Sequence, residues 1–200
     1  FKVAAYDRTK ELVIDPLLAA TLLGGSADDK AQSIAIDSEG NVFVAGSALS
    51  PDFPTTSGAY DTSHNGGSDV FVSKLSADLT TLLSSSFLGG SATEDAWSIA
   101  IDSSGNVLVA GYTSSSDFSN VSGAYDASHN GSEDAFVSRL NGDLTSLIAS
   151  TFLGGSDDER IVSLVFGSGG DIFVAGYTYS SGFPITPGAY DTFHNGSEDA

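Results

Sequence analysis

The sequence predicts an all-β protein made of β-propeller blades, each with four antiparallel strands and each encoded by one 65-residue repeat. The first observation behind this prediction is a repeat that contains no insertion or deletion. Leu-Gly-Gly-Ser begins at residues 23, 88 and 153, and Gly-Ala-Tyr begins at residues 58, 123 and 188. The second observation is that each repeat contains four short strand patterns separated by turns and loops. Four-stranded units at a fixed period are typical of propeller blades.

The strands of the first complete repeat are expected from its apolar pattern and its turns. They are residues 32–37, 41–47, 69–75 and 82–88. The first strand places Ile34 and Ile36 on one face, whereas the second is apolar on both faces, as expected for a strand between packed sheets. Gly40 marks the hairpin between them. Residues 48–68 contain prolines and glycines and predict a long surface loop.

Aligning the copies predicts how many blades the chain contains. The repeats lie in register at residues 24–88, 89–153 and 154–200, the last of which is incomplete. Two complete blades are expected at residues 27–88 and 92–153, a lone fourth strand at 17–23, and a first and second strand within 160–178. The array at 17–200 therefore holds about three blades, as an open arc or as part of a larger propeller, because closed propellers have roughly four to eight. A parallel β-helix would repeat at a much shorter period, and an immunoglobulin-like domain would need ~100 residues.

The ends of the array suggest that it does not act alone. An open arc exposes sheet edges, which favours association. We therefore expect either a longer native protein, of which this chain is a piece, or several copies that complete a ring or filament. Residues 1–16 are expected to be the tail of an upstream β-rich region.

Composition narrows the class of protein. The chain has 26 Asp and Glu against 7 Lys and Arg, a formal net charge of −19. This balance argues against binding to nucleic acid, because phosphate contacts require Lys and Arg, and against anionic membrane surfaces. There is no Cys, which excludes disulfides, Cys-based zinc sites and a thiol nucleophile. No apolar run reaches the ~20 residues of a membrane span, so no membrane insertion is expected.

Acidic residues recur in register and are candidates for a calcium site. Carboxylates follow each Gly-Gly-Ser motif, and calcium takes six to eight oxygen ligands from such groups. The candidate ligands are Asp28, Asp29, Glu94, Asp95, Asp157, Asp158 and Glu159. Two further columns are Asp61, Asp126, Asp191 and Asp69, Asp134, Asp199. No EF-hand loop or Gly-rich calcium repeat is present, and Asp also accepts hydrogen bonds from backbone N–H groups in turns. Calcium is thus the one cofactor suggested, beside a structural role for these acids.

Other polar motifs give weaker signals. His64, His129 and His194 occupy one position of successive repeats, so they should lie well apart and cannot share one zinc ion. Each precedes Asn-Gly, which is typical of a polar turn. The glycosylation sequon occurs at Asn120, Asn130 and Asn195, all within expected long loops.

No catalytic constellation is visible, so no catalytic residue and no enzymatic activity are expected. Gly-x-Ser-x-Gly is absent, and the Gly-Gly pairs lack the Lys and spacing of a phosphate loop. A glycosidase would need two carboxylates ~5–9 Å apart and residues that break the repeat symmetry. Trp97 is the outstanding unique residue, replaced by Gln32 and Val162 in the other copies, and packing explains it better than a sugar platform.

The amino-acid sequence of each repeat resembles that of a known family. Phe152-Leu-Gly-Gly-Ser, Ser98-Ile-Ala-Ile-Asp, Gly182-Phe-Pro-Ile-Thr-Pro-Gly-Ala-Tyr and Asp134-Ala-Phe-Val-Ser-Arg-Leu are similar to the SBBP-type β-propeller repeat, across residues 17–200. The resemblance implies large secreted or cell-surface proteins of bacteria and archaea, without a catalytic motif to carry over.

The function expected from these features is an extracellular structural or interaction scaffold. Its long loops, 48–68, 113–133 and 178–198, would bind protein or glycan partners, and its open sheet edges would support self-assembly. Two alternatives stay open: a calcium-stabilised adhesion or carbohydrate-binding module, and a segment of a polysaccharide-acting enzyme.

Overall fold

The computed structural model describes residues 19–119 and 123–200, and this part of the chain is all-β. Ten strands follow one another and no helix occurs among the described residues. The strands are β1 (Asp29–Ile36), β2 (Val42–Ala48), β3 (Asp69–Leu75), β4 (Leu82–Leu88), β5 (Glu94–Ile101), β6 (Val107–Thr113), β7 (Asp134–Leu140), β8 (Leu147–Leu153), β9 (Glu159–Phe166) and β10 (Ile172–Thr178). Accordingly, the described residues hold no helix that could cross a membrane.

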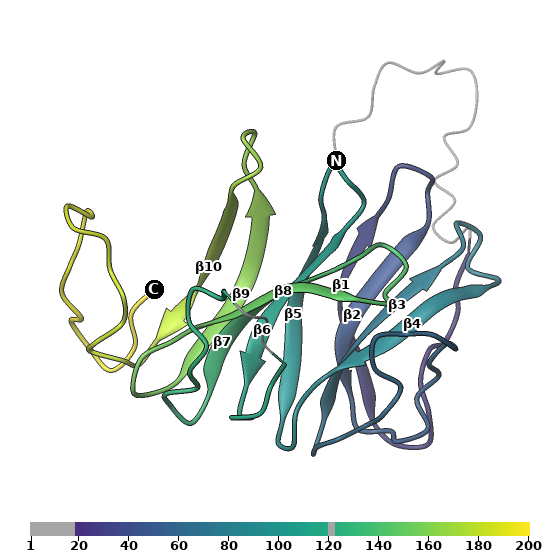
Figure 1. Ribbon diagram of the computed structural model, residues 1–200, viewed down its shortest axis with the longest axis horizontal. Helices are drawn as coiled ribbons and strands as arrows, with labels where there is room; N and C mark the ends of the chain where they lie inside the picture. Colours follow the sequence, from purple (N-terminus) through teal and green to yellow (C-terminus); the bar gives the residue numbers. More distant parts are fainter. Residues whose placement is uncertain (1–18, 120–122) are drawn as a thin grey trace, which may run out of the picture.

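The strands form separate antiparallel sheets that lie side by side (Figure 1). The first sheet has the order β1-β2-β3-β4, the second β5-β6-β7-β8, and β9 pairs with β10 alone. Each sheet is a meander of consecutive hairpins. The first strand of each sheet contacts the first strand of the next, since β5 lies against both β1 and β9. Antiparallel four-stranded sheets are what the repeat predicted; none of the sheets closes on itself.

Each first strand carries a β-bulge at the same position. The pairing of β1 with β2 shifts between Ala31 and Ser33, and the same shift occurs between Ala96 and Ser98. The bulge presses the backbone against the neighbouring strand, so the facing residue must lack a side chain. At Gly111 a Cβ would lie 1.9 Å from the carbonyl oxygen of Asp95. The recurring Ala-Gly of the sequence is therefore a packing requirement of the bulge.

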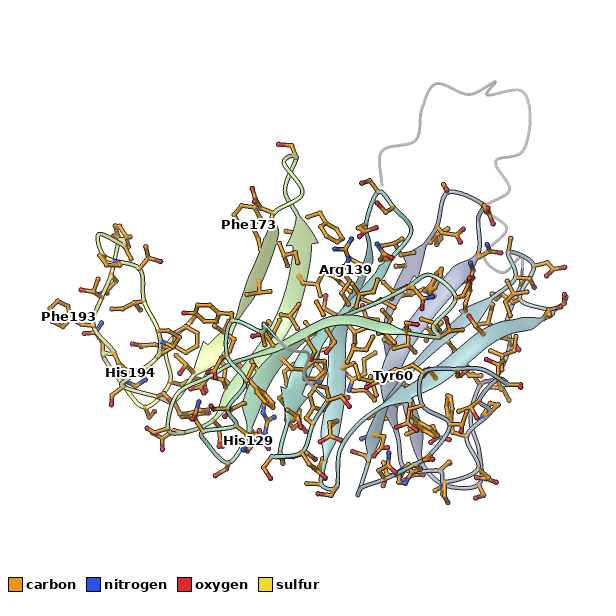
Figure 2. The ribbon with its side chains drawn as sticks, in the orientation of Figure 1. Tyr60, His129, Arg139, Phe173, Phe193 and His194 are labelled. Carbon is orange, nitrogen blue, oxygen red and sulfur yellow. The ribbon has the colours of Figure 1, made fainter. Side chains whose placement is uncertain are left out.

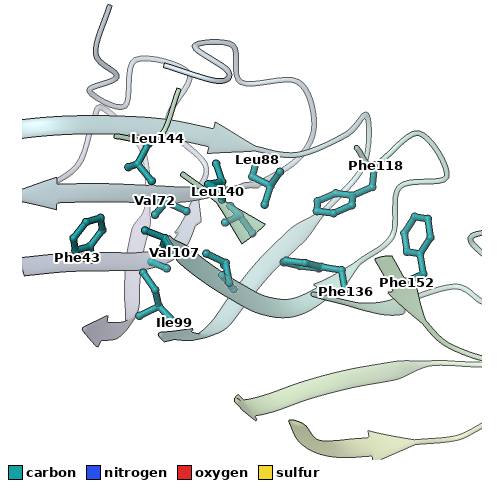
Figure 3. Close-up of a cluster of buried hydrophobic side chains, with 14 residues drawn as sticks. Phe43, Val72, Leu88, Ile99, Val107, Phe118, Phe136, Leu140, Leu144 and Phe152 are labelled. Atoms are coloured by element: carbon teal, nitrogen blue, oxygen red, sulfur yellow. The ribbon is translucent and has the colours of Figure 1, made fainter. Parts of the chain in front are cut away.

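The hydrophobic core lies between the sheets (Figure 3). The face of the first sheet that carries Phe43 and Ala45 packs against Ala96 and Ile99 of β5. In the same way Leu108 and Ala110 of β6, with Ala135 of β7, pack against Ile161 and Leu164 of β9. The second sheet therefore buries one face against the first sheet and the other against β9, which explains why β6 is apolar on both faces.

One expected strand is not formed. Residues 17–23 were aligned with β4 and β8, but residues 19–25 adopt no strand, and Leu22 is 99% exposed. Residues 17 and 18, and the proposed tail at 1–16, lie outside the described residues. A fourth strand needs the third strand of its own sheet as a partner, and no described strand precedes β1. Without that partner, residues 19–25 have no neighbouring strand with which to form backbone hydrogen bonds.

Candidate functional site

The Gly-Gly-Ser motifs lead from the outer strand of one sheet to the inner strand of the next, and each wraps around an acid. At the second sheet, Glu94 accepts hydrogen bonds from Gly90 N (2.8 Å), Thr113 Oγ1 (2.7 Å) and Ser115 Oγ (2.6 Å). Its side chain is completely buried. Glu159 and Asp29 make the corresponding bonds at their own motifs, to Gly155 N (2.6 Å) and Gly25 N (2.7 Å). This first column of acids therefore fixes the junction between blades.

A second column of acids faces the first across the same glycines. Asp69 accepts hydrogen bonds from Asn65 N (2.8 Å) and Gly66 N (3.1 Å). Asp134 does the same with Asn130 N and Gly131 N, both at 2.9 Å. The two columns meet at Gly154, where a Cβ would lie 2.8 Å from Asp134 Cγ and 2.9 Å from Glu159 Oε2. These glycines leave room for a buried pair of carboxyl groups.

Burial changes the proton affinity of these pairs. Desolvation raises the pKa of Asp69, Glu94 and Asp134 above the ordinary values, because the charged form loses its hydration. The negative charge of Asp69 adds to the rise of the Glu94 pKa, and that of Glu159 adds to the rise of the Asp134 pKa. The backbone and hydroxyl hydrogen bonds act in the opposite direction. Each of these junctions therefore holds two carboxyl groups, which carry the same charge when ionised, away from water.

The model of the beta-propeller repeat family SBBP matches residues 20–54 and 86–119. The resemblance to SBBP repeats is therefore confirmed. Both matches begin before a Gly-Gly-Ser motif and run through the first two strands of the following sheet, so they contain Asp29 and Glu94 of the first column of acids. No curated protein matches the chain significantly.

The remaining calcium candidates lie outside the hydrogen bonds that the first column of acids makes at the Gly-Gly-Ser motifs. Asp28 and Asp157 are exposed, and Asp158 is half-buried with its backbone oxygen bonded to Tyr179 N (2.9 Å). Asp95 accepts hydrogen bonds from Trp97 Nε1 (3.0 Å) and Gln32 Nε2 (2.6 Å). Within residues 19–119 and 123–200 no group of three or more acidic or histidine side chains is arranged to hold a metal ion. Calcium binding stays a prediction.

The histidines lie in the long loops that follow the second strand of each sheet. His64 Nε2 lies 3.1 Å from the carbonyl oxygen of Ala48, and its ring contacts Phe87 edge-on at 5.7 Å. His129 repeats both contacts with Thr113 O (3.2 Å) and Phe152 (5.8 Å). Figure 2 shows His129 and His194 on separate loops. These rings pack the long loop onto its sheet.

The candidate glycosylation sites lie in those loops. Asn130 and Asn195 are exposed, while Asn120 lies outside the described residues. Both amide nitrogens already bond within the loop: Asn130 Nδ2 donates to Ser128 O (3.0 Å) and Asn195 Nδ2 to Phe193 O (2.9 Å). Modification at either position stays a prediction.

The structure also reveals a cluster that breaks the repeat symmetry, which the sequence did not expose. Arg160 of β9 bonds to Glu133 Oε2 (2.5 Å) and lies over the rings of Tyr112 (4.3 Å) and Trp97 (5.7 Å). Residue 160 is equivalent to Lys30 in the first repeat and to Asp95 in the second, so the charge at this position changes sign between copies. This change of charge between the copies was the sequence feature that could have revealed the cluster. Because its members come from the second and third blades, the cluster ties these blades together.

Proposed function

We propose that this chain is a segment of an extracellular or cell-surface scaffold, which acts by assembly and by binding rather than by catalysis. The SBBP repeats support a repeat-based interaction scaffold. The net charge of −19 supports an exposed, well-solvated protein. The polar groups that recur in every blade also support a structural role, because their hydrogen bonds are used to hold the blade junctions.

The observation that carries the proposal is the exposure of apolar side chains at both ends of the array. Ile34 of β1 is 65% exposed, whereas its equivalents Ile99 and Leu164 are 6% and 5% exposed. Phe173 of β10 is 59% exposed, whereas its equivalent Leu108 is 1% exposed. Apolar faces of this kind are typical of interaction surfaces. We propose that the array of about three blades is an open arc that associates through these faces, or forms part of a larger propeller.

A hollow beside β10 adds to the exposed surface. A hollow of about 610 Å³ lies beside β10 and is lined by apolar side chains that include Val174 and Phe183. Figure 2 shows Phe173 on the β9–β10 hairpin and Phe193 on the loop at the same end of the array. Asp199 pairs with Thr178 as Asp69 pairs with Ala48, so this hollow is where a third strand runs in the complete sheets.

The long loops are the proposed surface for protein or glycan partners. Their exposed side chains include Tyr125 and Tyr190. The proposal includes no catalytic step: Glu133, the acid in the cluster that breaks the repeat symmetry, is ion-paired with Arg160. The buried acids are held by hydrogen bonds at the junctions.

Negative-stain electron microscopy of the concentrated chain tests the proposal. We expect rings, arcs of increasing length or filaments with a regular blade spacing. Single dispersed particles at every concentration would contradict self-assembly. The calcium-stabilised alternative is tested by the melting temperature in calcium and in chelator: an unchanged melting temperature would eliminate it.

A further inference from the structure

The same contact between side chains of adjacent blades recurs at both described junctions. The second residue of each first strand contacts the bulge residue of the preceding blade. Asp95 bonds to Gln32 at the first junction, and Arg160 lies over Trp97 at the second. A hydrogen bond from the backbone to a serine side chain accompanies each contact: Ile99 N donates to Ser33 Oγ (3.2 Å), and Leu164 N donates to Ser98 Oγ (3.0 Å).

Charge at each junction is matched to the residue that precedes the third strand of the earlier blade. At the second junction this residue is Glu133, and the residue that faces it is Arg160. At the first junction the corresponding residue is Ser68, and the partner strand brings Asp95 instead of a cation. A carboxylate at position 68 would repel Asp95. The two junctions are thus distinct in charge while sharing one backbone geometry.

The two ends of the array carry the halves of a third junction. The last blade presents Glu198, the equivalent of Glu133, with Tyr177 at the position of Tyr112. Glu198 is exposed and accepts a hydrogen bond from Tyr179 Oη (2.6 Å). The first blade presents Lys30 at the position of Arg160. Lys30 is exposed and makes no ion pair with any described residue.

We propose that a second copy of this chain docks head-to-tail, with the β1 face of one copy against the β10 face of the other. This inference rests on the self-assembly proposed above and names its interface. Lys30 of one copy meets Glu198 and Tyr177 of the other, as Arg160 meets Glu133 and Tyr112. Ala31 and Ile34 cover Phe173 and Ala175, as Ile161 and Leu164 cover Leu108 and Ala110. Ser163 Oγ accepts a hydrogen bond from Ile34 N of the neighbouring copy, following the two existing bonds of this kind.

The match is specific for this order of blades. Asp95 in place of Lys30 would set a carboxylate against Glu198, so the second blade cannot replace the first at this surface. The interface is heterologous, because it joins different faces of the two copies, and it leaves one free face at each end. Growth therefore leads to a closed ring or to a filament.

Charge exchange tests this interface. Lys30→Glu and Glu198→Lys each place like charges across the junction, and sedimentation equilibrium of each variant alone should show association weakened roughly tenfold or more. In an equimolar mixture of the two variants, copies can alternate so that every junction again joins a lysine to a glutamate. At one junction the lysine is at position 30 and the glutamate at position 198, as in the unmodified chain. At the next junction the two positions are exchanged. The mixture should therefore regain the association of the unmodified chain.

A matched control separates the interface from a general effect of charge. Asp143→Lys changes the net charge as Glu198→Lys does, at an exposed position in the turn between β7 and β8, and should leave association unchanged. If the unmodified chain associates but both variants associate equally well, the head-to-tail interface is wrong while self-assembly stands. If the unmodified chain stays monomeric, self-assembly itself fails, and the two faces are covered by something other than a second copy.

Discussion

At the scale of single residues, the buried carboxyl pairs couple the fold to pH. Asp69, Glu94 and Asp134 have no measurable exposure, and desolvation raises the pKa of each. A group with a raised pKa in the folded state binds its proton more tightly there than in the unfolded chain. Its contribution to stability is therefore full below the unfolded pKa and is lost as the pH rises through the folded pKa.

Surface aspartates contribute with the opposite sign. The hydroxyl groups of Ser76 and Thr80 lower the pKa of Asp78 to about 2, and Ser26 lowers the pKa of Asp52. Their contribution is present above the ordinary Asp value of 3.8 and is lost as the pH falls. These groups are fully exposed, so their effect is small. The melting temperature should accordingly be highest in mildly acidic solution and should decline toward neutral pH.

Asp69→Asn tests the role of the buried pair in this decline. Removing the titrating group removes its share of the fall in stability above pH 3.8, the ordinary value for Asp. As the pH rises above 3.8, the plot of melting temperature against pH should be shallower for the variant than for the parent, whatever the change in absolute stability. Calorimetry at several pH values measures it, and identical slopes would show that the carboxyl is not preferentially protonated in the folded state.

A second prediction at this scale concerns the glycine opposite the bulge. In Gly111→Ala the new Cβ would overlap the carbonyl oxygen of Asp95, which belongs to the backbone and cannot move aside. We expect the free energy of unfolding to fall by about 2 kcal/mol or more. Gly182→Ala is the control, since nothing lies within 4 Å of its Cβ position. Equal urea midpoints for the two variants would contradict the close contact.

At the scale of elements, the structure shows which strand limits the sequence could predict. The third and fourth strands were predicted with the limits that β3 and β4 have, because both end at clear turn signals. The first strand begins at Asp29, three residues before the predicted start at 32. The bulge at Gln32 disturbs the alternation on which that prediction depended, yet Asp29 to Ala31 still pair with β2. An alternation of apolar and polar residues with a period of two does not reveal where a bulge inserts one extra residue into a strand.

The turn between β7 and β8 ties two blades together and supplies a prediction for an element. Leu144 has φ 57° and is completely buried, and its carbonyl oxygen accepts a hydrogen bond from Tyr60 N (2.8 Å) of the first blade. A non-glycine residue in this region of φ is strained and must be stabilised by its surroundings. Here burial in the core between the first and second sheets supplies that stabilisation.

Leu144→Ala should therefore lower the free energy of unfolding by about 2–5 kcal/mol, because it leaves a cavity in the core. Leu79→Ala is the matched control: Leu79 has φ 58° in the equivalent turn of the first sheet but is only half-buried. Chemical denaturation of both variants compares them. A loss at Leu79 as large as that at Leu144 would mean that the turn conformation, and not burial, sets the cost.

The candidate site was only partly predictable for a related reason. The repeat placed Glu94 and its equivalents beside Gly-Gly-Ser, but it did not show that Asp69, 25 residues earlier, flanks the same glycines. That pairing depends on how the chain passes from an outer strand to the next inner strand. The sequence identified Trp97 as a unique residue but did not reveal that Arg160 contacts both Trp97 and Glu133. These contacts cross two blades and occur only once, whereas repeat analysis emphasises what recurs.

At the scale of the whole molecule, one blade junction occurs twice within the chain, and we propose that it recurs between copies. The inner junctions bury Ile99 and Leu164, while Ile34 remains exposed. A long-range obstacle opposes association, because each copy carries a net charge of −19. At physiological ionic strength the screening length is about 8 Å, so this repulsion is reduced while close contacts remain effective.

The solution mass of the unmodified chain at physiological ionic strength, measured by light scattering across a concentration series, tests this account most directly. Head-to-tail association predicts a mass that rises with concentration above the 20.4 kDa of one chain. A constant mass of one chain over the whole series would contradict it.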